Sequence, residues 1–90
     1  MKNKIALSSL SMDLRRVAIG YNRGSDKMAE RFFEEAIKRK KEIDVLELKP
    51  YVKKLLKKFE GIRLHKKKEK IAEDALLYSI LFQNAAVKYE

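Results

Sequence analysis

The stretch IAEDALLYSILFQNAAVKY, residues 71–89, decides the fold that this sequence predicts. At about 100° per residue, a helix over this stretch carries one apolar stripe made of Ile71, Ala75, Tyr78, Phe82, Ala85 and Tyr89. A second stripe lies nearly opposite and is made of Leu76, Ile80 and Val87. Leu77 and Leu81 fall between the two, so the middle of the helix is apolar on almost every side. Such a helix is usually buried on more than one side, in a bundle or against another chain.

A membrane span is the other interpretation of an apolar helix, and its length argues against it. The uncharged run from Ala75 to Val87 is 13 residues long, whereas a span needs roughly 18 or more. Glu73, Asp74 and Lys88 bracket the run. We therefore expect packing against protein, with no transmembrane segment.

Working outward from this helix, helical periodicity and turn residues predict three shorter ones. Ser9 or Ser11 can cap the first, and Asn22 to Gly24 would stop it. Pro50 suits a first helical position, and Gly61 suits the position after a helix end. The four predicted helices are Ser9–Tyr21, Asp26–Lys41, Pro50–Glu60 and Lys66–Lys88. We expect residues 1–8 to fray and residues 43–48 to form an irregular link.

The predicted fold class is all-α, a small four-helix bundle in a single domain over residues 1–90, with the C-terminal helix central. The other three helices would cover it with Leu14, Val17, Tyr21, Phe32, Phe33, Ile37, Val52, Leu55, Leu56 and Phe59. Three short helices are too few to cover both stripes of the last one. Leu77 and Leu81 are therefore the candidate oligomer interface, and dimerisation would complete the bundle.

The composition excludes several classes of site and fits a reducing compartment. The chain has no cysteine, so it has no disulfide frame and no thiolate metal ligand. We see no signal peptide or lipidation motif, and we expect a cytoplasmic protein. Its abundance of Lys and Glu resembles the composition of proteins from hot environments.

The net charge of +9 is confined to one third of the chain. Residues 38–70 hold fourteen Lys or Arg against five Asp or Glu, which accounts for the entire excess. Such a field attracts polyanions: nucleic acid, an anionic membrane surface or an acidic protein.

The helix dipole separates the informative lysines from the others. Lys57 and Lys58, like residues 38–41, end predicted helices, where cations are stabilising. Lys53 and Lys54 instead lie near the start of one, and residues 66–68 lie at the start of the last helix. A phosphate bound there would be attracted by the lysines and by free backbone N–H groups. A solvated, loosely ordered connection is the alternative interpretation.

Two functional hypotheses follow from these patterns. The first is a small basic protein that contacts nucleic-acid phosphates, in RNA or DNA, without strong sequence specificity. Its predicted contacts are Lys53, Lys54, Arg63, Lys66, Lys67 and Lys68. The second is a homo-oligomeric or accessory interaction module that uses the apolar C-terminal helix.

We expect no enzyme, no metal site, no cofactor and no small-molecule substrate. His65 is the only histidine, and no carboxylate partner can be assigned to it from sequence. Glu73 and Asp74 are adjacent on a helix and point about 100° apart. The sequence contains no glycine-rich phosphate loop and no nucleophile signature.

Overall fold

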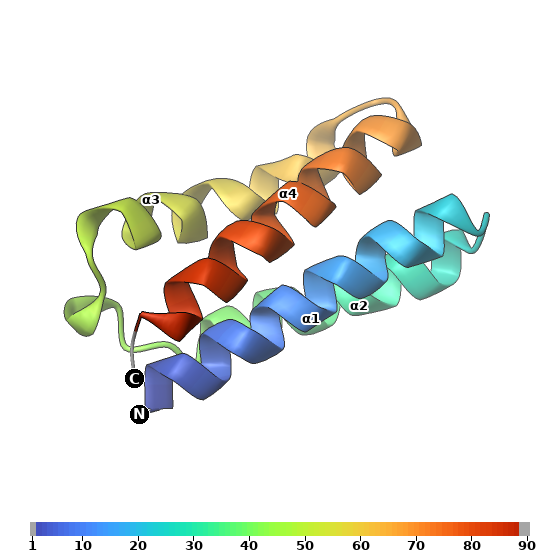
Figure 1. The fold of residues 1–90 in the computed structure, drawn as a ribbon. Helices are drawn as coiled ribbons and strands as arrows, with labels where there is room; N and C mark the ends of the chain where they lie inside the picture. Colours follow the sequence, from blue (N-terminus) through green and yellow to red (C-terminus); the bar gives the residue numbers. More distant parts are fainter. Residues whose placement is uncertain (1, 89–90) are drawn as a thin grey trace.

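The computed structural model describes residues 2–88. Its helices are α1 (Lys2–Asn22), α2 (Asp26–Lys40), α3 (Pro50–Lys58) and α4 (Lys68–Val87), with two 3₁₀ segments, η1 (Val45–Glu47) and η2 (Phe59–Leu64). The predicted class, an all-α four-helix bundle, is confirmed. Figure 1 shows α1 running antiparallel to both α2 and α4.

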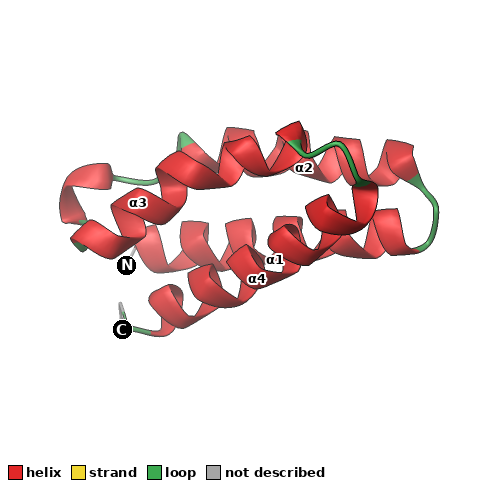
Figure 2. Cartoon of the chain, turned by 90° about the horizontal axis from the view of Figure 1, so that it is seen from above, coloured by secondary structure: helices red, strands yellow, loops and turns green. Residues whose placement is uncertain are grey.

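The bundle has two layers. Figure 2 shows α1 and α4 side by side in one layer, and α2 with the continuous arm of α3 and η2 in the other. Phe59 of η2 joins the layers, because its ring stacks on Phe33 of α2 at 6.1 Å between centroids. The same ring meets Phe82 of α4 edge-on at 6.0 Å. This aromatic contact closes the centre of the core.

Two of the predicted apolar surfaces are buried as expected. On α3, Val52 and Leu56 are buried, and Leu55 packs against them half-exposed. The first stripe of α4 also faces inward, although Tyr89 lies outside the described residues.

The central helix is not the predicted one. We expected the last helix to be central. It is α1, however, that packs against both α2 and α4, while α4 buries one side only.

The start of α1 differs from the prediction. The helix begins at Lys2, so within the described residues the segment before Ser9 is not frayed. Asn3 holds it in place: its amide donates to the Asp44 carbonyl at 2.9 Å and accepts from the Asp44 N–H at 2.9 Å. Because Asp44 lies 41 residues away in the chain, no local sequence signal predicts this anchor.

Serine 11 does not cap a helix but joins two. The Ser11 hydroxyl donates to the Ser79 carbonyl at 2.7 Å, and the Ser79 hydroxyl donates to the Ser11 carbonyl at 2.8 Å. Both side chains are buried. This reciprocal pair satisfies two buried hydroxyls and fixes the register of α1 against α4.

The predicted helix ends are right for α2 and partly wrong elsewhere. Gly24, in the predicted stop after the first helix, has a φ of +75°. Ser25 occupies the N-cap position of α2 but forms no cap hydrogen bond through its side chain. Gly61 does not end α3, because the chain continues through it as η2. The link over residues 43–48 is irregular except for η1, which the Asp44 side chain caps by accepting from the Leu46 N–H at 3.1 Å.

Gly20 permits a close contact between α1 and α2. A Cβ at this position would lie 2.8 Å from the Ala29 nitrogen and 3.0 Å from its Cα. The two helices approach closely because neither has a side chain larger than a methyl group there.

We predict that Gly20→Ala destabilises the protein, although alanine favours a helix by about 1 kcal/mol. The methyl group would push against backbone atoms, and overpacking of this kind costs about 1–3 kcal/mol. Gly61→Ala is the control, because nothing lies within 4 Å of a Cβ there and its φ is not positive. Thermal unfolding should show a lower Tm for Gly20→Ala and an unchanged or higher Tm for Gly61→Ala. Equal Tm values would mean that the hairpin separates without cost.

Candidate functional site

The four lysines of α3 lie on the side of the helix that faces away from the core. Because Val52 and Leu56 point inward, the helical periodicity turns Lys54, Lys57 and Lys58 to solvent and leaves Lys53 half-exposed. Within residues 2–88, no carboxylate lies within ion-pair distance of any of these four side chains; they are Lys53, Lys54, Lys57 and Lys58. Their positive charge is therefore not neutralised by the described part of the protein.

The predicted contacts near the start of α4 divide into two kinds. Lys66 and Lys67 are exposed and form no ion pair with the described residues. Lys68 is bonded to Asp26 of α2, and that hydrogen bond raises the pKa of the Lys68 ammonium. Arg63 also forms an ion pair, because its guanidinium donates a hydrogen bond to the Glu34 carboxylate at 3.0 Å.

The six predicted residues do not form one compact cluster. Lys53 and Lys54 belong to α3, whereas Lys66 and Lys67 lie in the connection between η2 and α4. Figure 1 shows α3 and this connection at opposite ends of the α3–η2 arm. The arm runs along the edge of the molecule, and the molecule is 36 Å long on its longest axis. The observed feature is a line of cations along this arm, in which Lys57 and Lys58 are additional members. From the sequence, we assigned these two lysines to the stabilisation of a helix end and not to binding.

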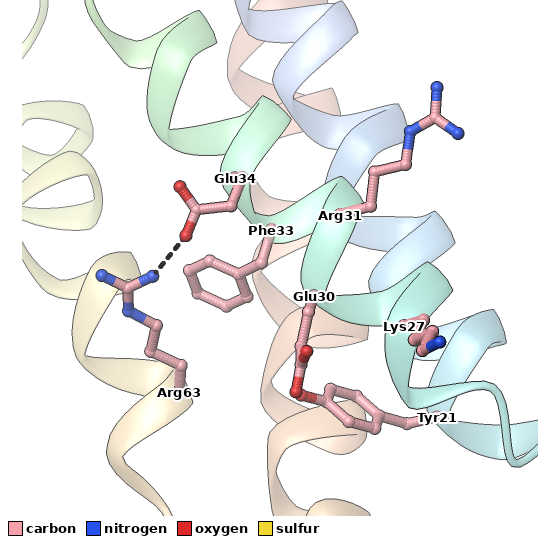
Figure 3. A pocket seen from close by; sticks show the side chains of 7 residues that line it. All are labelled: Tyr21, Lys27, Glu30, Arg31, Phe33, Glu34 and Arg63. Atoms are coloured by element: carbon pink, nitrogen blue, oxygen red, sulfur yellow. Dashed lines mark hydrogen bonds and ion pairs between the residues drawn. The ribbon is translucent and has the colours of Figure 1, made fainter.

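A pocket of about 490 Å³ lies between α2, the end of α1 and η2 (Figure 3). Its lining residues are Tyr21, Lys27, Glu30, Arg31, Phe33, Glu34 and Arg63. Figure 3 shows Arg63 turned toward Glu34 and away from Tyr21. Burial raises the pKa of the Tyr21 phenol, and the nearby carboxylates of Glu30 and Asp26 raise it further. The lining mixes cations and anions, so it favours no single class of ligand.

His65 has a carboxylate partner that sequence analysis missed. Its Nε2 lies 2.7 Å from an Asp74 oxygen, and Lys70 Nζ lies 3.2 Å from the other oxygen of the same carboxylate. The contact forms because the chain folds back at the start of α4, bringing residues nine apart together. His65 remains exposed. Within residues 2–88, no group of three His, Cys, Asp or Glu side chains is placed to hold a metal ion.

The outward side of α4 is apolar. Leu77 is 51% exposed, whereas Leu81, the other predicted interface residue, is half-buried. Leu76 and Ile80, from the second predicted stripe, are also exposed, at 45% and 51%. Among the helices in residues 2–88, none has the length and apolar character needed to span a membrane.

Asp13 is the buried charged group of α1. It lies in the middle of α1 and is 4% exposed. Arg39 Nε of α2 lies 3.6 Å from one of its oxygens and Arg16 lies 4.0 Å from the other. Burial raises the pKa of the Asp13 carboxyl above its ordinary value of 3.8, and the two arginines oppose this rise only in part. The ionised form therefore costs folding free energy.

We predict that Asp13→Asn stabilises the protein at pH 7. The folded pKa is raised, so the cost of ionisation is present above that pKa and disappears as the pH falls toward 3.8. The stability difference between variant and parent, measured by urea unfolding, should shrink over the same interval. Glu47→Gln, an exposed surface change, should alter the free energy of unfolding by no more than about 0.5 kcal/mol. A less stable Asp13→Asn at pH 7 would mean that the arginines outweigh burial.

Comparison with protein-family models, with curated protein sequences and with solved structures finds no match to this chain.

Proposed function

We propose that this protein binds the phosphate backbone of nucleic acid along the α3–η2 arm. The observation that supports the proposal most directly is the row of four α3 lysines, which no acidic side chain among the described residues neutralises. Unpaired cations on one edge retain their full attraction for a polyanion. Cations that already hold a carboxylate, such as Arg63, must give up that partner to bind another anion.

The shape of the arm favours a linear polyanion over a single anion. Lys53, Lys54, Lys57 and Lys58 follow a helix axis, and Lys66 and Lys67 continue the positive charge beyond η2. A nucleic-acid backbone has charges spaced along its length, so successive phosphates can meet successive lysines. The first turn of α4, which follows Lys67, adds the backbone N–H groups of Lys68 and Glu69, which have no intrahelical acceptor. The Lys70 N–H already donates to the Lys67 carbonyl at 3.1 Å.

The residue types on the arm favour backbone contacts over base recognition. Five of the six residues predicted to contact phosphates are lysines. A lysine side chain is a flexible point charge and does not have the planar geometry that reads a base edge. The two aromatic residues of the arm already have contacts within the protein. Phe59 is fully buried, and the Lys88 ammonium lies 5.4 Å from the centroid of the Tyr51 ring. We therefore propose binding with little sequence preference.

We predict that a fluorescently labelled RNA or duplex DNA binds at low salt and is released as salt rises. Six phosphate contacts should weaken binding on the order of a thousandfold between 50 and 200 mM salt. Fluorescence anisotropy at several salt concentrations gives the slope of log affinity against log salt. The proposal fails if neither nucleic acid binds at 50 mM salt, or if affinity is independent of salt.

The contribution of the arm can be separated from that of overall charge with two matched triple variants. Lys54, Lys57 and Lys58, replaced together by Gln, should lower the salt slope by about three units. Replacing Arg23, Lys27 and Arg31 by Gln removes the same charge from exposed positions outside the arm.

The second variant should retain most of the affinity and nearly the whole slope. If the two variants lose affinity equally, binding reflects net charge and the arm is not the site. Binding of anionic vesicles or an acidic protein in place of nucleic acid would also contradict the proposal. A third variant, Lys66→Gln with Lys67→Gln, tests whether the start of α4 belongs to the same surface.

A further inference from the structure

The outward side of α4 lacks the charges that a solvent-facing helix normally carries. From Leu76 to Val87 its exposed positions are apolar or uncharged: Leu76, Leu77, Ile80, Gln83, Asn84 and Val87. The exposed side of α2 shows the usual pattern, with Lys27, Glu30, Arg31, Glu34 and Lys38. Helices that face water carry charged residues on the outer side. The outer side of α2 has this pattern, and the outer side of the middle of α4 does not.

α1 contributes to the same surface. Its Met12 side chain is half-exposed and lines a groove of about 380 Å³ together with Leu76 and Ile80. The bottom of the groove is formed by Ser11 and Ser79, whose hydroxyls already donate to each other's backbone carbonyls. Covering the groove would therefore leave neither hydroxyl proton without an acceptor. Arg15 and Gln83 form polar edges.

The charge distribution permits two copies to meet at this surface. Residues 23–67 hold fifteen Lys or Arg and eight Asp or Glu, which is +7 of the net +9. Most of these residues belong to the α2 and α3–η2 layer, which lies on the other side of the molecule from the outward face of α1 and α4 (Figure 2). Two copies joined through α1 and α4 would keep their basic layers apart.

The charges that flank the apolar stretch favour one arrangement. Glu73 lies seven residues before Ile80, and Lys88 lies eight residues after it. Within one chain the Lys88 ammonium lies 5.4 Å from the centroid of the Tyr51 ring, so pairing with a second copy requires its side chain to turn away from that ring. If two α4 helices pack antiparallel with the two Ile80 side chains at the symmetry axis, Glu73 of one copy meets Lys88 of the other. At about 1.5 Å per residue, their levels along the axis agree to within about 1.5 Å. A parallel arrangement would instead place like charges together.

We propose that the outward face of α4, with Met12 of α1, is the interface of a two-fold homodimer in which the α4 helices pack antiparallel around Ile80. Apolar contact through Leu76, Leu77 and Ile80 supplies the attraction, and the Glu73–Lys88 pairs at both ends set the direction. The interface is isologous, as two-fold symmetry requires. It does not depend on polyanion binding, which uses the opposite layer.

The mass in solution tests the dimer. Sedimentation equilibrium over a range of concentrations should give about twice the chain mass of 10.6 kDa. Ile80→Glu should give the single-chain mass and an unchanged circular dichroism spectrum, since Ile80 is half-exposed within one chain. Leu46→Glu is the control, because Leu46 is 89% exposed on η1 and belongs to neither α1 nor α4, and that variant should remain dimeric.

A charge swap tests the antiparallel register. Glu73→Lys and Lys88→Glu should each shift the equilibrium toward monomer, because each places like charges opposite one another. The double variant restores opposite charges and should restore the dimer, a result that a merely structural effect of either change would not give. The proposal is overturned if the parent is monomeric at every concentration, if Ile80→Glu stays dimeric, or if the double variant remains as dissociated as the single ones.

Discussion

The burial of α1 on two sides is the constraint on which the remaining structure depends. α2 and α4 both pack against this helix, and each does so through small groups that bring the axes close. On the α2 side, Gly20 lies against Ala29 at a separation that leaves no room for a methyl group. On the α4 side, Ser11 and Ser79 exchange hydrogen bonds between the two backbones. Because these contacts are short and specific, they fix the positions of α2 and α4 relative to α1.

The arm of α3 and η2 then closes the side of the bundle that α1 does not reach. Phe59 places its ring between Phe33 and Phe82, so one residue of η2 contacts both layers. Lys40 supports the same contact from α2, since its ammonium lies 5.9 Å from the Phe59 ring centroid and 3.6 Å from Glu60. Because the apolar side of α3 packs into the core through Val52 and Leu56, its lysine side faces solvent. The basic edge is thus a direct consequence of how the core is closed.

The same packing leaves two outer surfaces of different character on opposite layers. One is the line of lysines along the arm, which form no ion pair with carboxylates of residues 2–88; the other is the uncharged, apolar side of α4 beside Met12. Their separation matters because burying a lysine-rich surface against a second copy would bring like charges together. A protein with this arrangement can associate through α1 and α4 and still expose the basic arm of each copy. Two arms in one particle would double the number of phosphate contacts available to a long polyanion.

The sequence by itself determined the helical class, the limits of α2 to within one residue and the inward stripe of α4. These follow from periodicity and from local signals such as the turn residues Asn22 to Gly24, which act over a few residues. It also located the excess of positive charge and the leftover apolar surface around Leu77.

Only the tertiary structure decided which lysines form no ion pair within residues 2–88, which carboxylate contacts His65 and where α1 begins. The physical reason is distance along the chain: Arg63 reaches Glu34 across 29 residues, Lys68 reaches Asp26 across 42, and Asn3 reaches Asp44 across 41. Periodicity fixes the direction in which a side chain leaves its helix, but the neighbouring element that it meets depends on how the whole bundle packs.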